Sequence, residues 1–298
     1  MYYSGFADEA AKDIAMQIAA TKELGWSNIE ARGLYGSNLG GITDAQFDDL
    51  CAKLDAAGVR INCYGSGIAN WAKHPRKEED FLASRTELVN ALPRMQKLGI
   101  KMLRGMSFLV PKDEQPDSPE LEAIIFRKLN ELVKLCEDAG VIYGHENCMN
   151  YGGLSYRHTL KMLENVKSPN FKLIYDTGNP VHSDDLSKPA PYPKQSSWEF
   201  YSNVKDHVVY VHIKDSLWDN EKGAIYTYPG EGLGDVERIV KDLLARGYDG
   251  GWSMEPHLAH VFHKPTDDDA AKEKIMCETY VEYGRRFMKI MERNISRK

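Results

Sequence analysis

Five stretches of the chain share one pattern, in which an amphipathic segment ends at a glycine and an apolar run follows. They are KELGWSNIEARG, DAAGVRINCYG, QKLGIKMLRGMS, EDAGVIYGHEN and LARGYDGGWSMEP. A glycine after the last turn of a helix supplies a left-handed cap, and runs rich in β-branched or aromatic residues are typical of buried strands. The pattern therefore predicts five helix-to-strand joints.

Three further apolar runs, YYSGF, FKLIYDTG and VVYVHIKD, complete a set of eight expected strands. These strands cover residues 2–6, 28–33, 59–65, 101–107, 141–147, 171–178, 208–215 and 250–256. Strands that alternate with helices form parallel βαβ units, and eight such units in a chain of 298 residues favour a closed (β/α)8 TIM barrel. No low-complexity linker divides the chain, so we expect residues 1–298 to form a single domain.

Long irregular segments follow the expected strands three, four, six and seven. They are SGIANWAKHP, PKDEQPDSP, GNPVHSDDLSKPAPYPKQS and SLWDNEKGAIYTYPGEG. Barrel enzymes build their active sites from the loops at the C-terminal ends of the strands. The sequence therefore predicts a functional site on that face.

Composition and charge narrow the class of protein. The chain is 42% hydrophobic and 28% charged, as in ordinary globular proteins, and it has no apolar run of about 18 residues that could span a bilayer. The N-terminal residues do not have the basic-then-apolar order of a signal peptide, so we expect a cytoplasmic protein without a membrane partner. The net charge of −6, without a Lys or Arg cluster, disfavours nucleic acid as a partner.

Polar residues at the ends of four consecutive expected strands form the main candidate site. Strands five to eight end in Glu146, Asp176, His212 and Glu255. Neighbouring strands of a barrel bring their ends together, so these side chains can converge on one point. Three carboxylates and one imidazole suit Mn²⁺, Mg²⁺, Co²⁺ or Zn²⁺ and leave positions for water or substrate. Each residue alone could instead cap a helix or form an ion pair.

Residues 214 and 215 follow the candidate histidine on strand seven. Lys214 shares a strand face with His212, because residues two apart point the same way. We expect Lys214 either to hold a substrate oxygen or to pair with Asp176 or Glu255. Asp215 is expected to face away and to brace a loop.

Basic and aromatic residues on the same face are further candidates for substrate contact. Arg104 and Arg32 lie at the ends of strands four and two, where each could bind an oxygen-rich substrate or form an ion pair. The loops carry Trp71, Trp218 and Tyr228, whose rings suit the C–H face of a sugar, with core packing as the alternative for Trp71.

Three histidines follow the last candidate ligand at a spacing of three residues. His257, His260 and His263 come after Pro256, in a loop or helical turn. On a helix this spacing would spread the rings over an arc of roughly 120°, so they do not form one metal-binding face. We expect His257 to reach the substrate and the other two to be loop or surface residues.

Five motifs together resemble those of one known superfamily. The motifs HEN (145–147), YDTGN (175–179), VHIKD (211–215), PGEGLGD (229–235) and SMEPH (253–257) look like those of the xylose isomerase-like sugar isomerases and epimerases. This superfamily also contains inosose dehydratases and nucleases of the endonuclease IV type. The resemblance runs from GFADEA to the last helix and implies a TIM barrel. It also implies that the four strand-end residues correspond to the metal ligands of ketose 3-epimerases.

The resemblance implies a metal-dependent sugar isomerase or epimerase. In ketose 3-epimerases two glutamates flank the carbon whose proton moves, which makes Glu146 and Glu255 the expected acid/base pair. A divalent metal ion on the carbonyl and the neighbouring hydroxyl stabilises the enediolate that forms when the proton leaves. We expect one such ion, Mn²⁺ before Mg²⁺, Co²⁺ or Zn²⁺, a sugar or sugar derivative as substrate, and a homo-oligomer.

Two positions depart from the epimerase pattern. A histidine usually contacts the substrate three residues after the aspartate ligand, whereas here Asn179 has that place and the next histidine is His182. Trp218 stands where an arginine usually follows the metal histidine. Both changes affect substrate contacts and leave the metal ligands intact, so they argue against a free ketose rather than against enolisation.

The main alternative is a metal-dependent lyase or dehydratase. After the same proton abstraction, such an enzyme expels a β-substituent from a keto-inositol or a 3-keto-glycoside. A histidine is suited to protonate the leaving oxygen, and His145 and His257 are the candidates.

An endonuclease IV-like nuclease and a non-catalytic sugar-binding barrel are the remaining alternatives. Strands two and three end in EARG and NCYG, without the histidines that help to hold three zinc ions in those nucleases. Metal content separates the possibilities, because we expect one ion for a sugar enzyme, three for a nuclease and none for a binding module.

Overall fold

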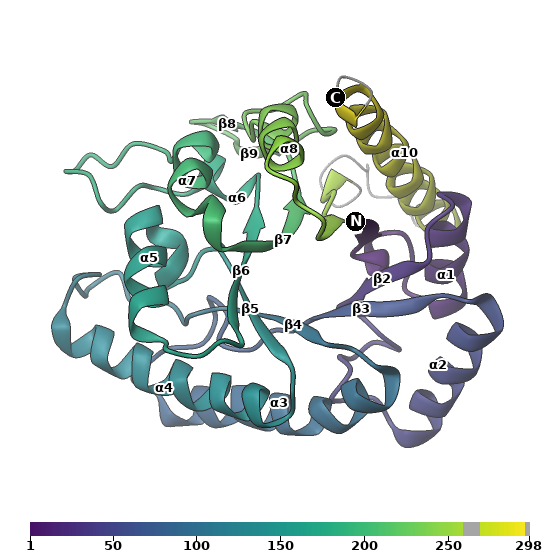
Figure 1. Ribbon diagram of the computed structural model, residues 1–298, viewed down its shortest axis with the longest axis horizontal. Coiled ribbons are helices and arrows are strands. Elements are labelled where there is room, and N and C mark those ends of the chain that lie inside the picture. The colour runs from purple at the N-terminus through teal and green to yellow at the C-terminus, as the bar shows by residue number, and fades with distance from the viewer. Residues whose placement is uncertain (259–268, 296–298) are drawn as a thin grey trace.

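Eight parallel strands form a nearly closed barrel in the computed structural model, which describes residues 1–258 and 269–295 (Figure 1). The strands are β1 (Tyr2–Gly5), β2 (Asn28–Ala31), β3 (Arg60–Gly65), β4 (Met102–Gly105), β5 (Ile142–Glu146), β6 (Phe171–Asp176), β7 (Val208–Ile213) and β10 (Gly251–Met254). Their order in the sheet is β1-β10-β7-β6-β5-β4-β3-β2, and a bridge between Phe6 and Glu30 brings the two edges together. The predicted (β/α)8 barrel is confirmed.

Helices surround the strands on the outside of the barrel (Figure 1). They are α1 (Ile14–Glu23), α2 (Asp44–Ala57), α3 (Glu78–Leu98), α4 (Pro119–Asp138), α5 (Tyr156–Asn165), α6 (Asn179–His182), α7 (Ser197–Val204), α8 (Val236–Ala245) and α10 (Asp269–Ile295). The C-terminal helix α10 packs against α1 and α8 and so joins the two ends of the chain. Within the described ranges, no helix is both long and apolar enough to cross a membrane.

The glycines of the predicted helix-to-strand joints all have the left-handed conformation. The φ angles are 73° at Gly25, 64° at Gly58, 70° at Gly99, 67° at Gly140 and 80° at Gly247. Such angles are rare for residues with a Cβ atom, which is why glycine stands at each of these helix ends. This local requirement explains why the expected strands lie close to the observed ones.

An apolar layer inside the barrel supports a polar layer at the C-terminal ends of the strands. Ile174 pairs in register with Tyr210, and two residues later Asp176 pairs with His212. Ile174 and Tyr210 form a buried cluster with Cys63. Because residues two apart on a strand face the same side, the apolar cluster lies directly beneath the polar pair.

A two-stranded hairpin follows β7 in a segment expected to be an irregular loop. Its strands are β8 (Ser216–Asp219) and β9 (Gly223–Tyr226), and β8 contacts α6. The Asp219 carboxylate accepts hydrogen bonds from the backbone N–H groups of Glu221 and Lys222, and Gly223 has a φ of 79°. These features make a tight turn and place the hairpin over the C-terminal face of the barrel.

Asp215 braces the glycine-rich segment that follows the hairpin, as predicted. Its carboxylate accepts hydrogen bonds from the backbone N–H groups of Gly230, Gly232 and Gly234 at 2.8, 3.0 and 2.8 Å. A Cβ atom at Gly232 would lie 2.3 Å from this carboxylate, so only glycine fits there. These N–H groups bind Asp215 and therefore do not form a phosphate cradle.

We predict that Asp215→Ala lowers the free energy of unfolding by at least about 3 kcal/mol, because it leaves several backbone N–H groups without an acceptor. Urea denaturation measures this change. The control is Asp206→Ala, which removes an exposed carboxylate paired with Arg246 and should cost less than about 0.5 kcal/mol. Equal losses in the two variants would contradict the bracing role of Asp215.

Candidate metal centre

Four residues far apart in the sequence meet at the C-terminal ends of adjacent strands. Glu146 ends β5, Asp176 ends β6, His212 lies in β7 and Glu255 directly follows β10. Each offers one ligand atom, these atoms all lie within 4.8 Å of one another, and all four residues are buried. The structure thus brings together the set that the strand-end pattern predicts.

His212 lies between two carboxylates. Its Nδ1 is 3.1 Å from Oε1 of Glu146, and its Nε2 is 3.1 Å from both carboxylate oxygens of Glu30. Burial acts to lower the pKa of His212, but Glu30 and Glu146 outweigh it and raise the pKa to about 10. The ring therefore turns Nδ1 toward the cluster, while Glu30 holds the opposite edge.

Glu146 is compensated by Arg104 of β4, Asn179 at the start of α6 and His212 of β7. Arg104 places a guanidinium nitrogen 3.3 Å from Oε2, and the side-chain amide of Asn179 donates to Oε1 at 3.4 Å. Burial acts to raise the pKa of Glu146, but Arg104 and His212 outweigh it and lower the pKa to about 2. Glu146 is thus a buried carboxylate that stays ionised.

Glu255 is surrounded by three basic side chains. Lys214 Nζ is 2.8 Å from Oε2, whereas Arg32 and His257 approach Oε1 to 3.1 and 3.3 Å. Burial acts to raise the pKa of Glu255, but Lys214, His257 and Arg32 hold it well below its usual value. The ion pair that was one of the two expectations for Lys214 is therefore present, and Lys214 also lies 3.2 Å from Asp176.

Asp176 has an oxygen available for a cation. Its Oδ1 accepts hydrogen bonds from the backbone N–H groups of Gly178 and Asn179 at 2.9 and 2.6 Å. Its Oδ2 is buried and accepts no hydrogen bond, although Lys214 lies within ion-pair distance. Burial raises the pKa of Asp176 to about 6 despite the opposing charge of Lys214. A set of three carboxylates and one imidazole is suited to bind a divalent cation. Oδ2 of Asp176, which accepts no hydrogen bond, could be one of the ligand atoms.

Two acidic residues that the strand-end pattern did not identify support this cluster. Glu30 lies in β2 and is buried. In the sequence, the signal that could have identified it is a glutamate inside the predicted strand, in the run NIEA. Glu9 lies in a short 3-10 helix (Ala7–Glu9) and accepts hydrogen bonds from Arg32 and from the backbone N–H of His257. Its carboxylate also lies 2.9 Å from Nδ1 of His257. Glu30 thus orients the candidate ligand His212, and Glu9 orients Arg32 and His257, which both contact Glu255.

Of the six predicted substrate contacts, four lie at the cluster, and His145 and His182 do not contact the candidate ligands. Arg104, Asn179, Lys214 and His257 all contact candidate metal ligands. His145 does not join them, although it precedes a ligand in sequence. Adjacent strand residues point to opposite faces, so its ring turns outward, where Nε2 hydrogen bonds with Ser107 and Asn150. This placement does not support substrate contact by His145.

The expected aromatic residues also lie away from the cluster. Trp71 is 42% exposed, Trp218 stacks beneath the Lys194 ammonium, and Tyr228 packs between Tyr283 and Arg286. The ring that approaches the cluster instead is Tyr226, at the end of β9. Sequence reasoning missed Tyr226 because it treated the hairpin as an irregular loop.

The ring of Tyr226 lies between two of the predicted histidines. Its edge-on contact with His257 has a centroid distance of 5.0 Å, and that with His182 a distance of 6.3 Å. His182 ends α6, three residues after Asn179. The other two histidines that follow Glu255, His260 and His263, lie outside the described residues.

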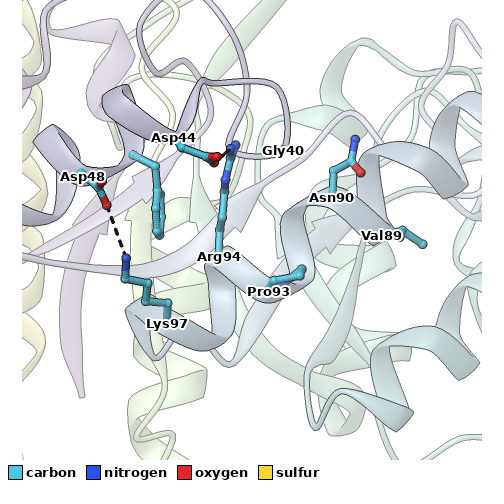
Figure 2. A pocket seen from close by; sticks show the side chains of 9 residues that line it. Gly40, Asp44, Asp48, Val89, Asn90, Pro93, Arg94 and Lys97 are labelled. Atoms are coloured by element: carbon cyan, nitrogen blue, oxygen red, sulfur yellow. Dashed lines mark hydrogen bonds and ion pairs between the residues drawn. The ribbon is translucent and has the colours of Figure 1, made fainter.

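A surface groove of about 580 Å³ lies between α2 and α3, on the helical layer (Figure 2). Its charged residues pair with one another, Arg94 with Asp44 at 3.0 Å and Lys97 with Asp48 at 3.4 Å. Both basic side chains also lie over the Phe47 ring. These contacts are those of helix packing, and the groove contains none of the strand-end residues.

A curated relative matches part of the chain. Uncharacterized protein MJ1311 of Methanocaldococcus jannaschii is 27% identical over 161 residues, which are 53% of this chain and 48% of that protein. The chain thus covers about half the length of this relative.

Solved structures share the fold over nearly the whole chain. A Methylomonas D-allulose 3-epimerase in complex with D-allulose has a TM-score of 0.67, 18% identity and coverage of 96% of each chain. A Mycobacterium smegmatis xylose isomerase-like TIM barrel protein in complex with magnesium has a TM-score of 0.65, 16% identity and coverage of 98% and 97%. A probable 3-DHS dehydratase from Bacillus anthracis has a TM-score of 0.65, 14% identity and coverage of 95% and 98%. At identities this low, these comparisons establish the shared fold alone.

The family model for the xylose isomerase-like TIM barrel matches residues 18–277. This range begins in α1 and ends within α10, so it includes β2 to β10 and all four strand-end residues. The chain therefore belongs to the xylose isomerase-like TIM barrel family.

Proposed function

We propose that this protein is a divalent-metal-dependent enzyme that moves a proton on a keto-sugar through an enediolate, as a sugar isomerase or epimerase. The observation that carries the proposal is the buried cluster of Glu146, Asp176, His212 and Glu255. In the barrel order β5, β6, β7, β10, the two glutamates stand at the two ends of this set. A sugar carbon held over the cluster would have one carboxylate on each side.

The four cluster residues would hold the metal ion. Carboxylate and imidazole ligands favour Mn²⁺ as the first candidate, with Mg²⁺, Co²⁺ and Zn²⁺ as alternatives. When bound, the ion supplies a Lewis acid that polarises the substrate carbonyl and so acidifies the neighbouring C–H group. Glu30 would fix the orientation of His212, since a metal-bound histidine usually donates its second ring N–H to a carboxylate.

Glu146 and Glu255 are the proposed acid/base pair. Neighbouring basic groups lower the pKa of both residues, so each is ionised near neutral pH and can accept a proton. One carboxylate removes the proton from carbon and becomes a carboxylic acid, which in an isomerisation returns that proton to the adjacent carbon. In an epimerisation the other glutamate would first have to take up a proton and would then give it to the opposite face, so that the two residues exchange protonation states. Geometry supports this pairing because both side chains converge on the same buried point.

Lys214, Arg104, Asn179, His182 and His257 are the proposed substrate contacts. Lys214 is best placed to hold a hydroxyl or a developing oxyanion, because its ammonium lies between Asp176 and Glu255. The nearby basic groups Arg32 and Arg104 already pair with carboxylates, which favours a neutral sugar over a phosphorylated one. We also propose that the enzyme is a cytoplasmic homo-oligomer.

A metal-dependent lyase is the second candidate. The observation that favours it is His182, whose Nε2 is buried without a hydrogen-bond partner beside the ring of Tyr226. A histidine in that position can hydrogen bond to a departing oxygen, and its imidazolium form would transfer the proton that completes the elimination once the same carbanion has formed. The dehydratase among the solved structures shares the fold, which accommodates this chemistry.

We predict that Glu30→Gln weakens Mn²⁺ binding about 10- to 100-fold, because it removes the carboxylate that orients His212. Isothermal titration of the metal-free protein measures the change in Kd. Glu122→Gln is the matched control, since Glu122 is also buried but pairs with Lys161 and Tyr151 outside the cluster. Unchanged affinity in the Glu30 variant would contradict the orienting role.

We predict that Glu146→Gln and Glu255→Gln each reduce proton exchange by about 10²- to 10⁴-fold, because an amide cannot act as the base or the acid. NMR of keto-sugars incubated with the Mn²⁺-loaded protein in D₂O measures deuterium incorporation. Circular dichroism checks that the variants fold, and Glu122→Gln should exchange like the parent protein. Full proton exchange in Glu146→Gln or in Glu255→Gln would contradict the acid/base role of the glutamate that was replaced.

We predict that products from a panel of keto-sugars and 3-keto-glycosides separate the two candidate reactions. Deuterium at the carbon next to the carbonyl of an isomerised or recovered sugar is the expected result for an isomerase or epimerase. Mass spectrometry of an unsaturated product and a released substituent would instead identify the lyase and overturn the favoured reaction.

A further inference from the structure

The outer face of α3 carries a stripe that is uncharged in its middle and oppositely charged at its two ends. We call this stripe the α3 seam; its residues in chain order are Glu79, Leu82, Thr86, Val89, Pro93 and Lys97. With about 3.6 residues per helical turn, these positions lie within an arc of about 80°. All six side chains are exposed, Leu82 at 50% and Val89 at 42%.

The α3 seam is a second apolar face of a helix whose first face is already buried. Phe81, Leu88 and Met95 pack inward on the barrel and leave the seam to solvent. Single exposed apolar residues are common on protein surfaces and need no explanation. The seam differs because its positions recur every three or four residues, which is the spacing by which one helix packs on another.

The groove of Figure 2 lies beside the C-terminal half of the α3 seam. Val89 and Pro93 of the seam line it, together with Phe47 from α2 (Figure 2). Its acidic and basic side chains neutralise one another in the pairs described above, so the groove offers apolar surface without a free charge at its rim. Its volume of about 580 Å³ is ample for an apolar side chain from another helix.

The charges at the two ends of the α3 seam are of opposite sign. Glu79 lies in the acidic first turn of α3 and has no ion-pair partner within residues 1–258 and 269–295. Lys97 lies in the last turn, where its ammonium is 3.4 Å from the Asp48 carboxylate and 62% of the lysine side chain is exposed. A second carboxylate can therefore approach Lys97 from solvent.

We propose that a second copy of this chain docks on the α3 seam, with the two α3 helices antiparallel about a twofold axis near Leu88, the midpoint of the helix. This arrangement sets Glu79 opposite the partner's Lys97, Leu82 opposite the partner's Pro93 and Thr86 opposite the partner's Val89. The interface does not depend on the proposed reaction, because α3 lies in the helical layer outside the strands (Figure 1).

The seam is complementary to itself only in this antiparallel arrangement. Each contact occurs twice, as a twofold interface requires, and opposite charges meet at both ends. Leu82 of each copy enters the groove of the other, because it lies opposite Pro93, which lines that groove. A parallel pair would instead place Glu79 against the partner's Glu79.

The first test removes the apolar contact. Sedimentation of the purified protein over a range of concentrations measures self-association, and we expect the parent protein to dimerise. Leu82→Asp should weaken dimerisation at least about tenfold, because it places a carboxylate in the partner's apolar groove. Leu233→Asp is the matched control, since Leu233 is 58% exposed and lies outside the seam, and it should dimerise like the parent protein.

The second test reverses the end charges at low ionic strength. Glu79→Lys and Lys97→Glu should each weaken dimerisation at least about tenfold, because each brings like charges together at both ends of the seam. An equimolar mixture of the two variants should dimerise again, because both contacts then join opposite charges. A purely intramolecular role of these residues would not produce this recovery.

The outcomes separate the interface from the proposed function. A parent protein that is monomeric at every concentration, an assembly whose mass does not fall in Leu82→Asp, or a mixture that does not recover association would overturn the interface. Circular dichroism checks that each variant folds. A parent dimer that dissociates in Leu82→Asp but exchanges no sugar proton would support the interface and overturn the reaction.

Discussion

Electrostatic repulsion among buried carboxylates is the constraint on which the C-terminal end of this barrel depends. Glu30, Glu146, Asp176 and Glu255 lie close together with almost no solvent to screen them. Such charges are tolerated only when cations and hydrogen bonds compensate them. The compensating groups come from several strand ends, so the position of each acid depends on the whole ring of strands. A site of this kind also favours a bound divalent cation, because the cation replaces repulsion with shared coordination.

Much of the fold could be predicted because its signals are local. A left-handed glycine at five helix ends, with an apolar run after each, marks five strands, and three further apolar runs mark the others. The strand ends then identify Glu146, Asp176, His212 and Glu255. The parallel order of a barrel brings those ends together without knowledge of any side-chain contact. Alternation along β7 likewise predicted that Lys214 and Asp215 face opposite sides.

Other features depend on contacts that sequence position does not reveal. Glu30 lies within a strand and Glu9 in a short N-terminal turn, so neither occupies a strand end. Tyr226 reaches the histidines only because the segment after β7 folds back as a hairpin. His145 is the opposite case. It was predicted to contact the substrate and adjoins the ligand Glu146 in sequence, but its ring faces Ser107 and Asn150. Tertiary packing decides these cases.

We expect one divalent ion to bind where the four strand-end residues converge. Metal analysis of the purified protein after exposure to Mn²⁺ and dialysis tests it most directly, with Asp176→Asn measured in parallel. We expect one ion per chain in the parent protein and a clear loss in the variant, because Asp176 supplies an oxygen that accepts no hydrogen bond. No bound ion, three zinc ions per chain, or an unchanged content in Asp176→Asn would contradict it.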